Sequence, residues 1–204
     1  MRRTAIVPRK TKETEIIVKL NIDGTGKSKI NTGIGFLDHM LELFSFWGFF
    51  DLEIKAKNCD LKVDIHHTNE DIGLVLGQAF KKALGKKLGI KRIGYASVTM
   101  EETVAFVSLD ICGRGFSQVV IGTQITPGKN KSKQDVYSLE YLRHFLEGFA
   151  NQLGMNLNIT INYPTNDIHA TLEPLFKALG VALDQATQID IRRKGVPSTK
   201  GVID

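Results

Sequence analysis

Adjacent histidines lie beside carboxylates in the segment DIHHTNEDIG, residues 64–73, of a 204-residue chain that holds only five histidines. His66 and Glu70 are four residues apart, as are His169 and Glu173 later in the chain. On a helix, this spacing puts an imidazole and a carboxylate on one face, one turn apart. Imidazole nitrogen and carboxylate oxygen together suit divalent ions such as zinc, iron and manganese. The alternative interpretation is a capped helix start whose histidines happen to be neighbours.

Both His–Glu pairs belong to an internal repeat. Residues 66–83 resemble residues 169–186, and residues 36–44 resemble residues 141–149, each at an offset of about 100 residues. The repeat matches the following site candidates: His39 with His144, His66 with His169, and Glu70 with Glu173. Packing alone explains repeated leucines and glycines, but it explains repeated histidines and glutamates poorly. We therefore expect two half-sites, which hold two metal ions or share one.

The remaining histidines differ in their expected surroundings. His39 and His144 lie between leucines in amphipathic segments, so both are expected to be buried, where coordination of a metal would satisfy the ring. His67 projects about 100° away from His66 around a helix, which suits a second ion or a neighbouring chain. The absence of a thiolate from these segments disfavours a structural zinc site.

Composition indicates a soluble globular protein, with 42% hydrophobic and 24% charged residues. No apolar run approaches the length of a membrane helix, and the basic N-terminal segment lacks the apolar region of a secretion signal. Cys59 and Cys112 lie far apart without a CxxC spacing, which is typical of reduced thiols. We therefore expect a cytoplasmic protein.

The net charge of +5 fits either a nucleic-acid surface or a pocket for a small anionic substrate. The densest basic segment, KKALGKKLGIKRIG at residues 81–94, lacks the interleaved aromatic residues of a single-strand binder, and a solvated helix face explains it as well. A nucleic-acid-binding protein remains an alternative, but it leaves the paired histidines unexplained.

Periodicity predicts alternating strands and helices. The strand at 14–23 runs into the turn GTGKS and is expected to pair with a strand at 29–32. Further strands and helices are expected at these ranges: strands 50–57, 95–100, 103–111, 116–125 and 156–163, and helices 35–48, 72–89, 138–154 and 170–187. Two rounds of strands, helix, strand and helix predict a layered α+β fold, with the halves meeting near residues 90–95.

Seven segments, in order along the chain, carry a resemblance to a known family: RKTKET (9–14), GIGFLDHML (33–41), DIHHTNEDIGLVLGQA (64–79), GIKRIG (89–94), DICGRGF (110–116), LEPLFKALGVALDQA (172–186) and PSTKGVI (197–203). Together they resemble imidazoleglycerol-phosphate dehydratase of histidine biosynthesis. The resemblance runs from about residue 9 to the C-terminus without large gaps. It implies a hydro-lyase that removes water from imidazole glycerol phosphate to give imidazole acetol phosphate.

The resemblance implies a duplicated α+β fold in which each half is a four-stranded sheet with two helices on one face. Residues 1–93 would form the first half, and residues 94–204 the second half with a phosphate-binding tail. It also implies trimers that assemble into a 24-subunit particle, with two manganese ions per active site where subunits meet. The expected partner is the phosphorylated imidazole substrate, with no nucleic acid or membrane.

Carried over by position, the resemblance implies three sets of site residues. The metal ligands would be His39, His66, His67, Glu70, His144, His169 and Glu173. The catalytic candidates would be Glu13, Glu70 and Glu173, with Glu13 taking the carbon-bound proton. The substrate-binding residues would be Glu13, His39, His66, His67, Glu70, Arg92, Arg114, His169, Lys177, Ser198, Thr199 and Lys200. Arginine offers a bidentate fork to phosphate, and lysine offers a point charge.

One position departs from the family pattern. The family has a second histidine directly after the one that matches His169, and this sequence has Ala170. Because a methyl group cannot coordinate a metal, one ion should lose a protein ligand, which Asp167 or water would replace. The alternative function is therefore an assembled, metal-binding homologue with impaired activity.

Overall fold

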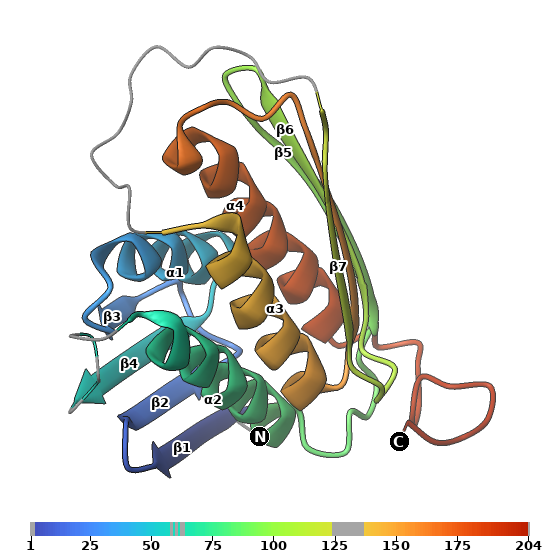
Figure 1. The fold of residues 1–204 in the computed structure, drawn as a ribbon. Coiled ribbons are helices and arrows are strands. Elements are labelled where there is room, and N and C mark those ends of the chain that lie inside the picture. The colour runs from blue at the N-terminus through green and yellow to red at the C-terminus, as the bar shows by residue number, and fades with distance from the viewer. Residues whose placement is uncertain (1–2, 58, 60, 62–63, 124–136, 204) are drawn as a thin grey trace.

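The computed structural model describes residues 3–57, 59, 61, 64–123 and 137–203. It contains two four-stranded sheets with helices between them (Figure 1). The sheets have the strand orders β1-β2-β4-β3 and β5-β6-β8-β7, so the second repeats the topology of the first. None of the helices in these ranges is long and apolar enough to cross a membrane.

The first copy contains two helices that pack on one sheet. Alternating apolar residues such as Ile16 and Val18 point inward from its central strand, which buries one face of the sheet. Its elements are β1 (Thr4–Lys10), β2 (Glu15–Asn21), β3 (Ser28–Asn31), α1 (Gly35–Trp47), β4 (Asp51–Lys57) and α2 (His66–Leu84).

The second copy repeats this arrangement. Ala105, Val107 and Leu109 take the same inward positions on its central strand. Its elements are β5 (Ile93–Met100), β6 (Thr103–Asp110), β7 (Phe116–Ile121), α3 (Leu139–Leu153), β8 (Asn156–Asn162) and α4 (Ile168–Thr187). The expected duplicated α+β fold is therefore confirmed.

The expected pairing of the strand at 14–23 with the strand at 29–32 is wrong. β3 pairs in parallel with β4, with Ile30 opposite Ile54, and β4 lies between β2 and β3. A short polar turn favours a local hairpin between β2 and β3. In the structure β4 pairs with β2 instead, which places the buried Ile54 opposite the buried Val18. Burial of these apolar side chains favours β4 over β3 as the neighbour of β2.

Two further differences concern single strands. β1 was not expected, because its charged residues and Pro8 hide an alternation in which only Ala5 is fully buried. The strand expected at 116–125 ends at Ile121, and residues 124 and 125 lie outside the described part of the chain.

Glycines allow the helices of the two copies to approach closely. A Cβ atom at Gly77 of α2 would lie 2.6 Å from the Phe149 carbonyl oxygen of α3. A Cβ atom at Gly180 of α4 would lie 2.5 Å from the Phe44 carbonyl oxygen of α1. The repeat therefore conserves these two glycines for packing: each lies where a helix of one copy meets a helix of the other.

All of these helices contribute to one hydrophobic core. Phe44 from the first copy contacts Phe149 from the second, with ring centroids 6.2 Å apart. The expected division at residues 93 and 94 stays a prediction about domain organisation. The shared core nevertheless fixes how α1 and α2 face α3 and α4.

Candidate metal and anion sites

One cluster of site candidates joins α1 to α4. The Nε2 atom of His169 lies 2.8 Å from the Oε2 atom of Glu173, and the Nε2 atom of His39 lies 3.8 Å from the same oxygen. The rings of His39 and His169 stack with centroids 5.0 Å apart. One donor atom from each residue lies within 4.8 Å of the others. We call these three residues the α1–α4 cluster.

A second cluster joins α2 to α3. The Nδ1 atoms of His66 and His144 lie 3.1 Å apart, and the Nε2 atom of His66 lies 3.7 Å from the Oε2 atom of Glu70. We call these three residues the α2–α3 cluster. Each cluster thus combines a His–Glu pair from one copy with a single histidine from the other copy.

The starts of α2 and α4 differ in how they are capped. The N-cap residue of α4, Asp167, accepts a hydrogen bond from the His169 N–H at 2.8 Å. The N-cap residue of α2, Ile65, makes no side-chain cap, but Asp64 just before it accepts from the His66 N–H at 3.2 Å. Each bond satisfies a backbone donor that the helix leaves without a partner. Both bonds hold a histidine in the first turn of its helix, from which its side chain reaches a cluster.

The expectation that His39 and His144 are buried is wrong. Both are half-buried, and 42% of the His39 side chain is exposed. Their neighbours Leu37, Leu41, Leu142 and Leu146 are buried in the core. The histidines instead border the solvent, which leaves room for an ion or a substrate to reach them.

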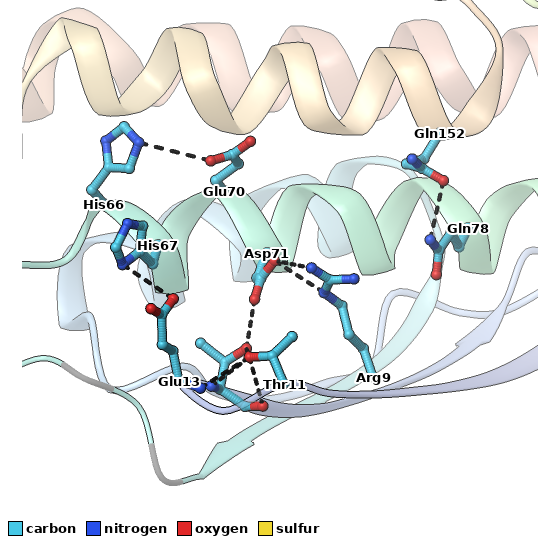
Figure 2. Close-up of polar contacts among 10 residues, drawn as sticks. Arg9, Thr11, Glu13, His66, His67, Glu70, Asp71, Gln78 and Gln152 are labelled. Carbon is cyan, nitrogen blue, oxygen red and sulfur yellow. Dashed lines mark hydrogen bonds and ion pairs between the residues drawn. The ribbon is translucent and has the colours of Figure 1, made fainter.

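His67 lies beside the α2–α3 cluster, with its ring centroid 5.6 Å from that of His66, but its polar contact is with another residue. Its Nδ1 atom lies 3.4 Å from the Oε2 atom of Glu13, in the turn between β1 and β2 (Figure 2). Both side chains are more than half exposed. The position matched to His67 is Ala170, which is only 9% exposed. The repeat is therefore asymmetric at this position.

A separate pocket gathers cationic side chains. Its lining residues are Arg92, Cys112, Arg114, Ser198, Thr199, Lys200 and Val202. The Nε and Nη2 atoms of Arg92 donate to Asp110 at 2.5 and 2.8 Å, and this hydrogen-bonded carboxylate raises the pKa of Arg92. The Nη1 atom of Arg92 donates to the Pro197 carbonyl oxygen at 2.9 Å. That bond ties the C-terminal tail to the pocket.

Lys177 contacts Glu173 of the α1–α4 cluster and is not among the lining residues of the pocket that contains Arg92 and Arg114, which we call the cation pocket. Its Nζ atom is 2.5 Å from the Oε1 atom of Glu173. Burial alone would raise the pKa of Glu173, but the hydrogen bonds from Lys177 and His169 outweigh it and lower this pKa. Glu173 is therefore ionised and available as a ligand at neutral pH.

The donor set fits a divalent ion. Histidine nitrogen and carboxylate oxygen bind such ions at about 2.0–2.2 Å, and one donor atom from each residue of the α1–α4 cluster lies within 4.8 Å of the others. His39, His169 and Glu173 could therefore hold such an ion after side-chain rotation. In the α2–α3 cluster, His66, Glu70 and His144 offer the same kinds of donor.

Several residues of this region were not expected from the sequence. Asp110 orients Arg92, and Cys112 lines the cation pocket. Arg9 and Asp71 form an ion pair beneath the turn that carries Glu13. Arg9 and Asp71 both lie in segments that carry the family resemblance, and this resemblance is the signal that could have marked them as site residues. No local sequence pattern indicates that the two residues form a pair.

The fold and these clusters define a class of protein: an internally duplicated α+β enzyme scaffold in which each copy supplies equivalent histidines and glutamates. The family model described as imidazoleglycerol-phosphate dehydratase matches residues 32–183. The chain belongs to the imidazoleglycerol-phosphate dehydratase family, whose members are hydro-lyases of histidine biosynthesis.

Individual relatives agree with this family. Imidazoleglycerol-phosphate dehydratase of Geobacter metallireducens is 47% identical over 98% of this chain and 99% of that protein. The protein of the same name from Methanocella arvoryzae is 47% identical over 98% of this chain and 100% of that protein.

Two solved structures are similar in fold. The enzyme of this family from Pyrococcus furiosus, solved in complex with (S)-C348, has a TM-score of 0.78 and 34% identity over 96% of this chain and 99% of that chain. Imidazoleglycerol-phosphate dehydratase from Staphylococcus aureus has a TM-score of 0.72 and 30% identity over 91% of this chain and 99% of that chain.

Proposed function

We propose that the chain catalyses the metal-dependent dehydration of imidazole glycerol phosphate to imidazole acetol phosphate in the cytoplasm. The observation that carries this proposal is the pair of matched clusters. In each cluster a His–Glu pair from one copy meets a single histidine from the other copy. Packing of the helices does not require these clusters, because a partly buried imidazole needs a polar partner that an apolar side chain would not need. Two unpaired thiols, Cys59 and Cys112, fit a reducing compartment.

The clusters would hold two manganese ions per active site, and His67 would supply a further ligand. Bound ions of this kind would act as Lewis acids and as a template for the imidazole ring. His39, His169 and Glu173 offer donors for one ion, while His66, Glu70 and His144 offer donors for the other. The Lys177 ammonium compensates the negative charge of Glu173.

The other side chains would bind and deprotonate the substrate. Arg114 and Lys200 offer cationic donors to the phosphate, and Ser198 and Thr199 offer hydroxyl groups. Glu13 would take the hydrogen from the carbon that bears the second hydroxyl group, as a general base. The carbon–oxygen bond beside the ring breaks, the departing hydroxide gains a proton to become water, and the resulting enol becomes the ketone.

The proposed active site needs more than one chain. Arg92 lies at the end of the second sheet where Asp110 pairs with Asn156. The α1–α4 cluster follows the opposite end of β8, because α4 begins after Asn162 (Figure 1). Seven strand residues separate these ends by about 20 Å, whereas the five bonds between ring and phosphate span at most about 7 Å. A neighbouring chain would supply one of the two halves.

An exposed apolar surface supports self-association. The outer face of the second sheet carries large apolar side chains that are 45–71% exposed: Ile93, Tyr95, Phe106, Phe116 and Val120. Large exposed apolar surfaces of this kind commonly mark sites of protein–protein contact. We propose a homo-oligomer, built from trimers into 24 subunits, with neither nucleic acid nor membrane as a partner.

Metal removal tests the proposed function. The purified chain is expected to lose turnover of imidazole glycerol phosphate after chelation and to regain it with Mn²⁺, and elemental analysis is expected to give about two ions per chain. Equal turnover by the metal-free protein would contradict metal dependence. A metal-loaded protein that leaves this substrate unchanged would contradict the dehydratase assignment.

Ala170 favours a second candidate, an assembled metal-binding homologue with impaired turnover. Loss of a group that only supports a metal ligand typically costs about 10- to 100-fold in metal affinity or activity, and loss of a ligand itself is expected to cost at least as much. The change Ala170→His is then expected to raise both turnover and the number of bound ions. Unaltered turnover and metal content in this variant would exclude the impaired homologue.

A further inference from the structure

A buried carboxylate that neither cluster uses lies beneath the turn between β1 and β2. Asp71 is 9% exposed and projects from α2 toward this turn (Figure 2). Its Oδ2 atom accepts a hydrogen bond from the Thr14 hydroxyl at 2.5 Å. Its Oδ1 atom accepts one from the Nε atom of Arg9 at 3.0 Å, and the Nη2 atom of Arg9 lies 2.8 Å away.

The bonds around Asp71 have a fixed direction. An ionised carboxylate only accepts hydrogen bonds, so the single hydroxyl hydrogen of Thr14 goes to Asp71. At the 3.2 Å contact between the Thr11 and Thr14 hydroxyl groups, Thr14 therefore has no hydrogen to donate, and Thr11 is the donor. The Thr14 carbonyl oxygen is the other acceptor within reach of the Thr11 hydroxyl, at the longer distance of 3.5 Å. The Thr11 oxygen then accepts from the backbone N–H groups of Glu13 at 3.1 Å and Thr14 at 2.9 Å.

The chain of bonds ends at the Glu13 backbone. Thr14 is 2% exposed, and Thr11 also accepts the turn's backbone donors, so Asp71 fixes the backbone of the turn from the side of α2. The Glu13 carboxylate also points toward α2, where it meets His67, 3.4 Å away (Figure 2). Asp71 and His67 both belong to α2, so one helix holds the turn at two points.

The second copy lacks this arrangement, which makes it an internal control. In the first copy the last paired residues before the turn are Lys10 and Glu15, and the matched pair in the second copy is Thr99 and Val104. The second copy adds one more pair, Met100 with Thr103, so its turn is the shorter of the two. The register places Thr103 in the position of Thr14 and Val98 in that of Arg9. The repeat places Pro174 in the position of Asp71.

The same fold therefore forms without the buried ion pair. Thr103 is also fully buried, but its hydroxyl donates to the Tyr163 carbonyl oxygen at 3.0 Å. The copy that keeps Arg9 and Asp71 is the copy that has His67, whereas the other has Ala170 at the matched position. A buried ion pair also gives little net stability on average. These facts connect the pair with the site at Glu13 and His67.

We propose that Asp71 is a positioning residue that acts through Thr14 and Thr11, with Arg9 orienting its carboxylate, to hold Glu13 against His67. This inference rests on the proposed role of Glu13 in proton transfer. Misplacement of a reacting group by about 1 Å can lower the rate 10²-fold. Loss of rigidity in the turn is therefore expected to affect kcat more than KM.

The first test is the isosteric change Asp71→Asn. The amide nitrogen would face either the Arg9 guanidinium or the Thr14 hydroxyl, so one of the two contacts is lost or reversed. We expect kcat to fall by about 10- to 100-fold, with KM and the bound metal content within about twofold of the wild type. A loss that appears in KM or metal content alone would overturn the proposal.

Asp51→Asn is the matched control. Asp51 also holds a turn, because its Oδ1 atom accepts from the Thr25 N–H at 2.8 Å and from the Thr25 hydroxyl at 3.3 Å. It lies beside Asn21, at the end of β2 opposite Glu15 and the Glu13 turn. We expect this variant to lose stability and to keep kcat. An equal fall in kcat would show that loss of any turn-holding carboxylate has this effect.

A double-mutant cycle separates this proposal from the role of Glu13. Glu13→Gln alone is expected to lower kcat by about 10²- to 10⁴-fold, and adding Asp71→Asn is expected to lower it no further. If the two losses multiply, Asp71 does not act through Glu13 and the proposal fails. If Glu13→Gln turns over like the wild type, the proposed role of Glu13 itself fails.

Thr14 provides a second route should Asp71→Asn fold poorly. Thr14→Val removes the hydroxyl group at nearly constant volume, whereas Thr14→Ser keeps it. We expect kcat to fall for valine and to return to within about threefold of the wild type for serine. Equal values of kcat for the two variants would overturn the proposed hydrogen-bond relay.

Discussion

Glu173 contacts two imidazoles and one ammonium group at once. Its two oxygens contact His169, His39 and Lys177, all within 3.8 Å. The side chain is 13% exposed, and a carboxylate this buried is stable only when its charge is compensated. The Lys177 ammonium supplies the compensating positive charge in the structure, and a bound divalent ion would add to it.

Arg114 gives a prediction at the scale of single residues. Arg114→Ala removes a cation from the cation pocket, where the proposed function places the substrate phosphate, and hydrogen bonds to charged groups are worth about 1.5–3 kcal/mol. We expect KM for imidazole glycerol phosphate to rise by about 10- to 100-fold with a smaller change in kcat, measured by steady-state kinetics.

The exposed Arg192 offers a control for this change. It pairs with Asp190 at 2.6 Å and is 85% exposed, so Arg192→Ala is expected to leave KM unchanged. Parallel rises in KM for the two variants would show that the effect comes from net charge and not from the pocket.

At the scale of the elements, close helix crossings hold the clusters together. Gly180 lies where α4 touches α1, and an added methyl group would meet the Phe44 carbonyl oxygen at 2.5 Å. Backbone cannot move aside as a flexible side chain can, so Gly180→Ala is expected to lower the free energy of unfolding by about 1–3 kcal/mol. Urea denaturation measures this change.

Gly35 provides the comparison for Gly180. No atom lies within 4 Å of a Cβ atom built on Gly35, the first residue of α1. Gly35→Ala is therefore expected to leave the free energy of unfolding unchanged or to raise it slightly. Equal destabilisation of the two variants would contradict the role assigned to the crossing.

Asp51 gives a prediction of pH dependence. Burial alone would raise its pKa, but hydrogen bonds from the Thr25 N–H, Asn21 and the Lys27 N–H outweigh it and lower the pKa below the ordinary value of 3.8. A carboxylate with a lowered folded pKa stabilises the protein above its unfolded pKa, and this contribution disappears as the pH falls through the folded pKa.

The measurement compares the wild type with Asp51→Asn by urea denaturation at a series of pH values. The wild type is expected to be the more stable at pH 6, and the difference is expected to shrink steadily below pH of about 4. A difference that stays constant down to the acid-unfolding range would show that the charge of Asp51 does not hold the turn.

At the scale of the whole molecule, the two parts of the proposed site lie at opposite ends of the second sheet. The cation pocket includes Arg114, and the α1–α4 cluster includes His169. If a neighbouring chain completes each site, two variants that are each defective in a different part should complement one another. This outcome distinguishes a shared site from one that each chain forms alone.

The complementation experiment uses Arg114→Ala and His169→Ala, expressed together with different affinity tags. Random mixing is expected to leave roughly a quarter of the sites with both parts intact, since each site takes its parts from different chains. The assay uses substrate well below the wild-type KM, where the raised KM of Arg114→Ala keeps its own rate low, and the rate of the mixed oligomer should approach that share of the wild-type rate. A mixed oligomer no faster than the mean of the two variants alone would show that the two parts act within one chain.

The sequence by itself determined much of the architecture. Periods of 3.6 and 2 residues identified the helices and all but one of the strands, because local periodicity follows from which face is buried. The offset repeat paired His39 with His144 and His66 with His169. The spacing of four residues put Glu70 and Glu173 on the same faces as their histidines.

Only the tertiary structure decided how these pieces meet. It placed β4 between β2 and β3, joined His39 to His169 and His66 to His144, and left both single histidines half-buried. It also set Asp71 beneath the Glu13 turn. Each of these contacts joins segments far apart in the chain, and their pairing depends on sheet register and helix crossing, which local sequence patterns do not encode.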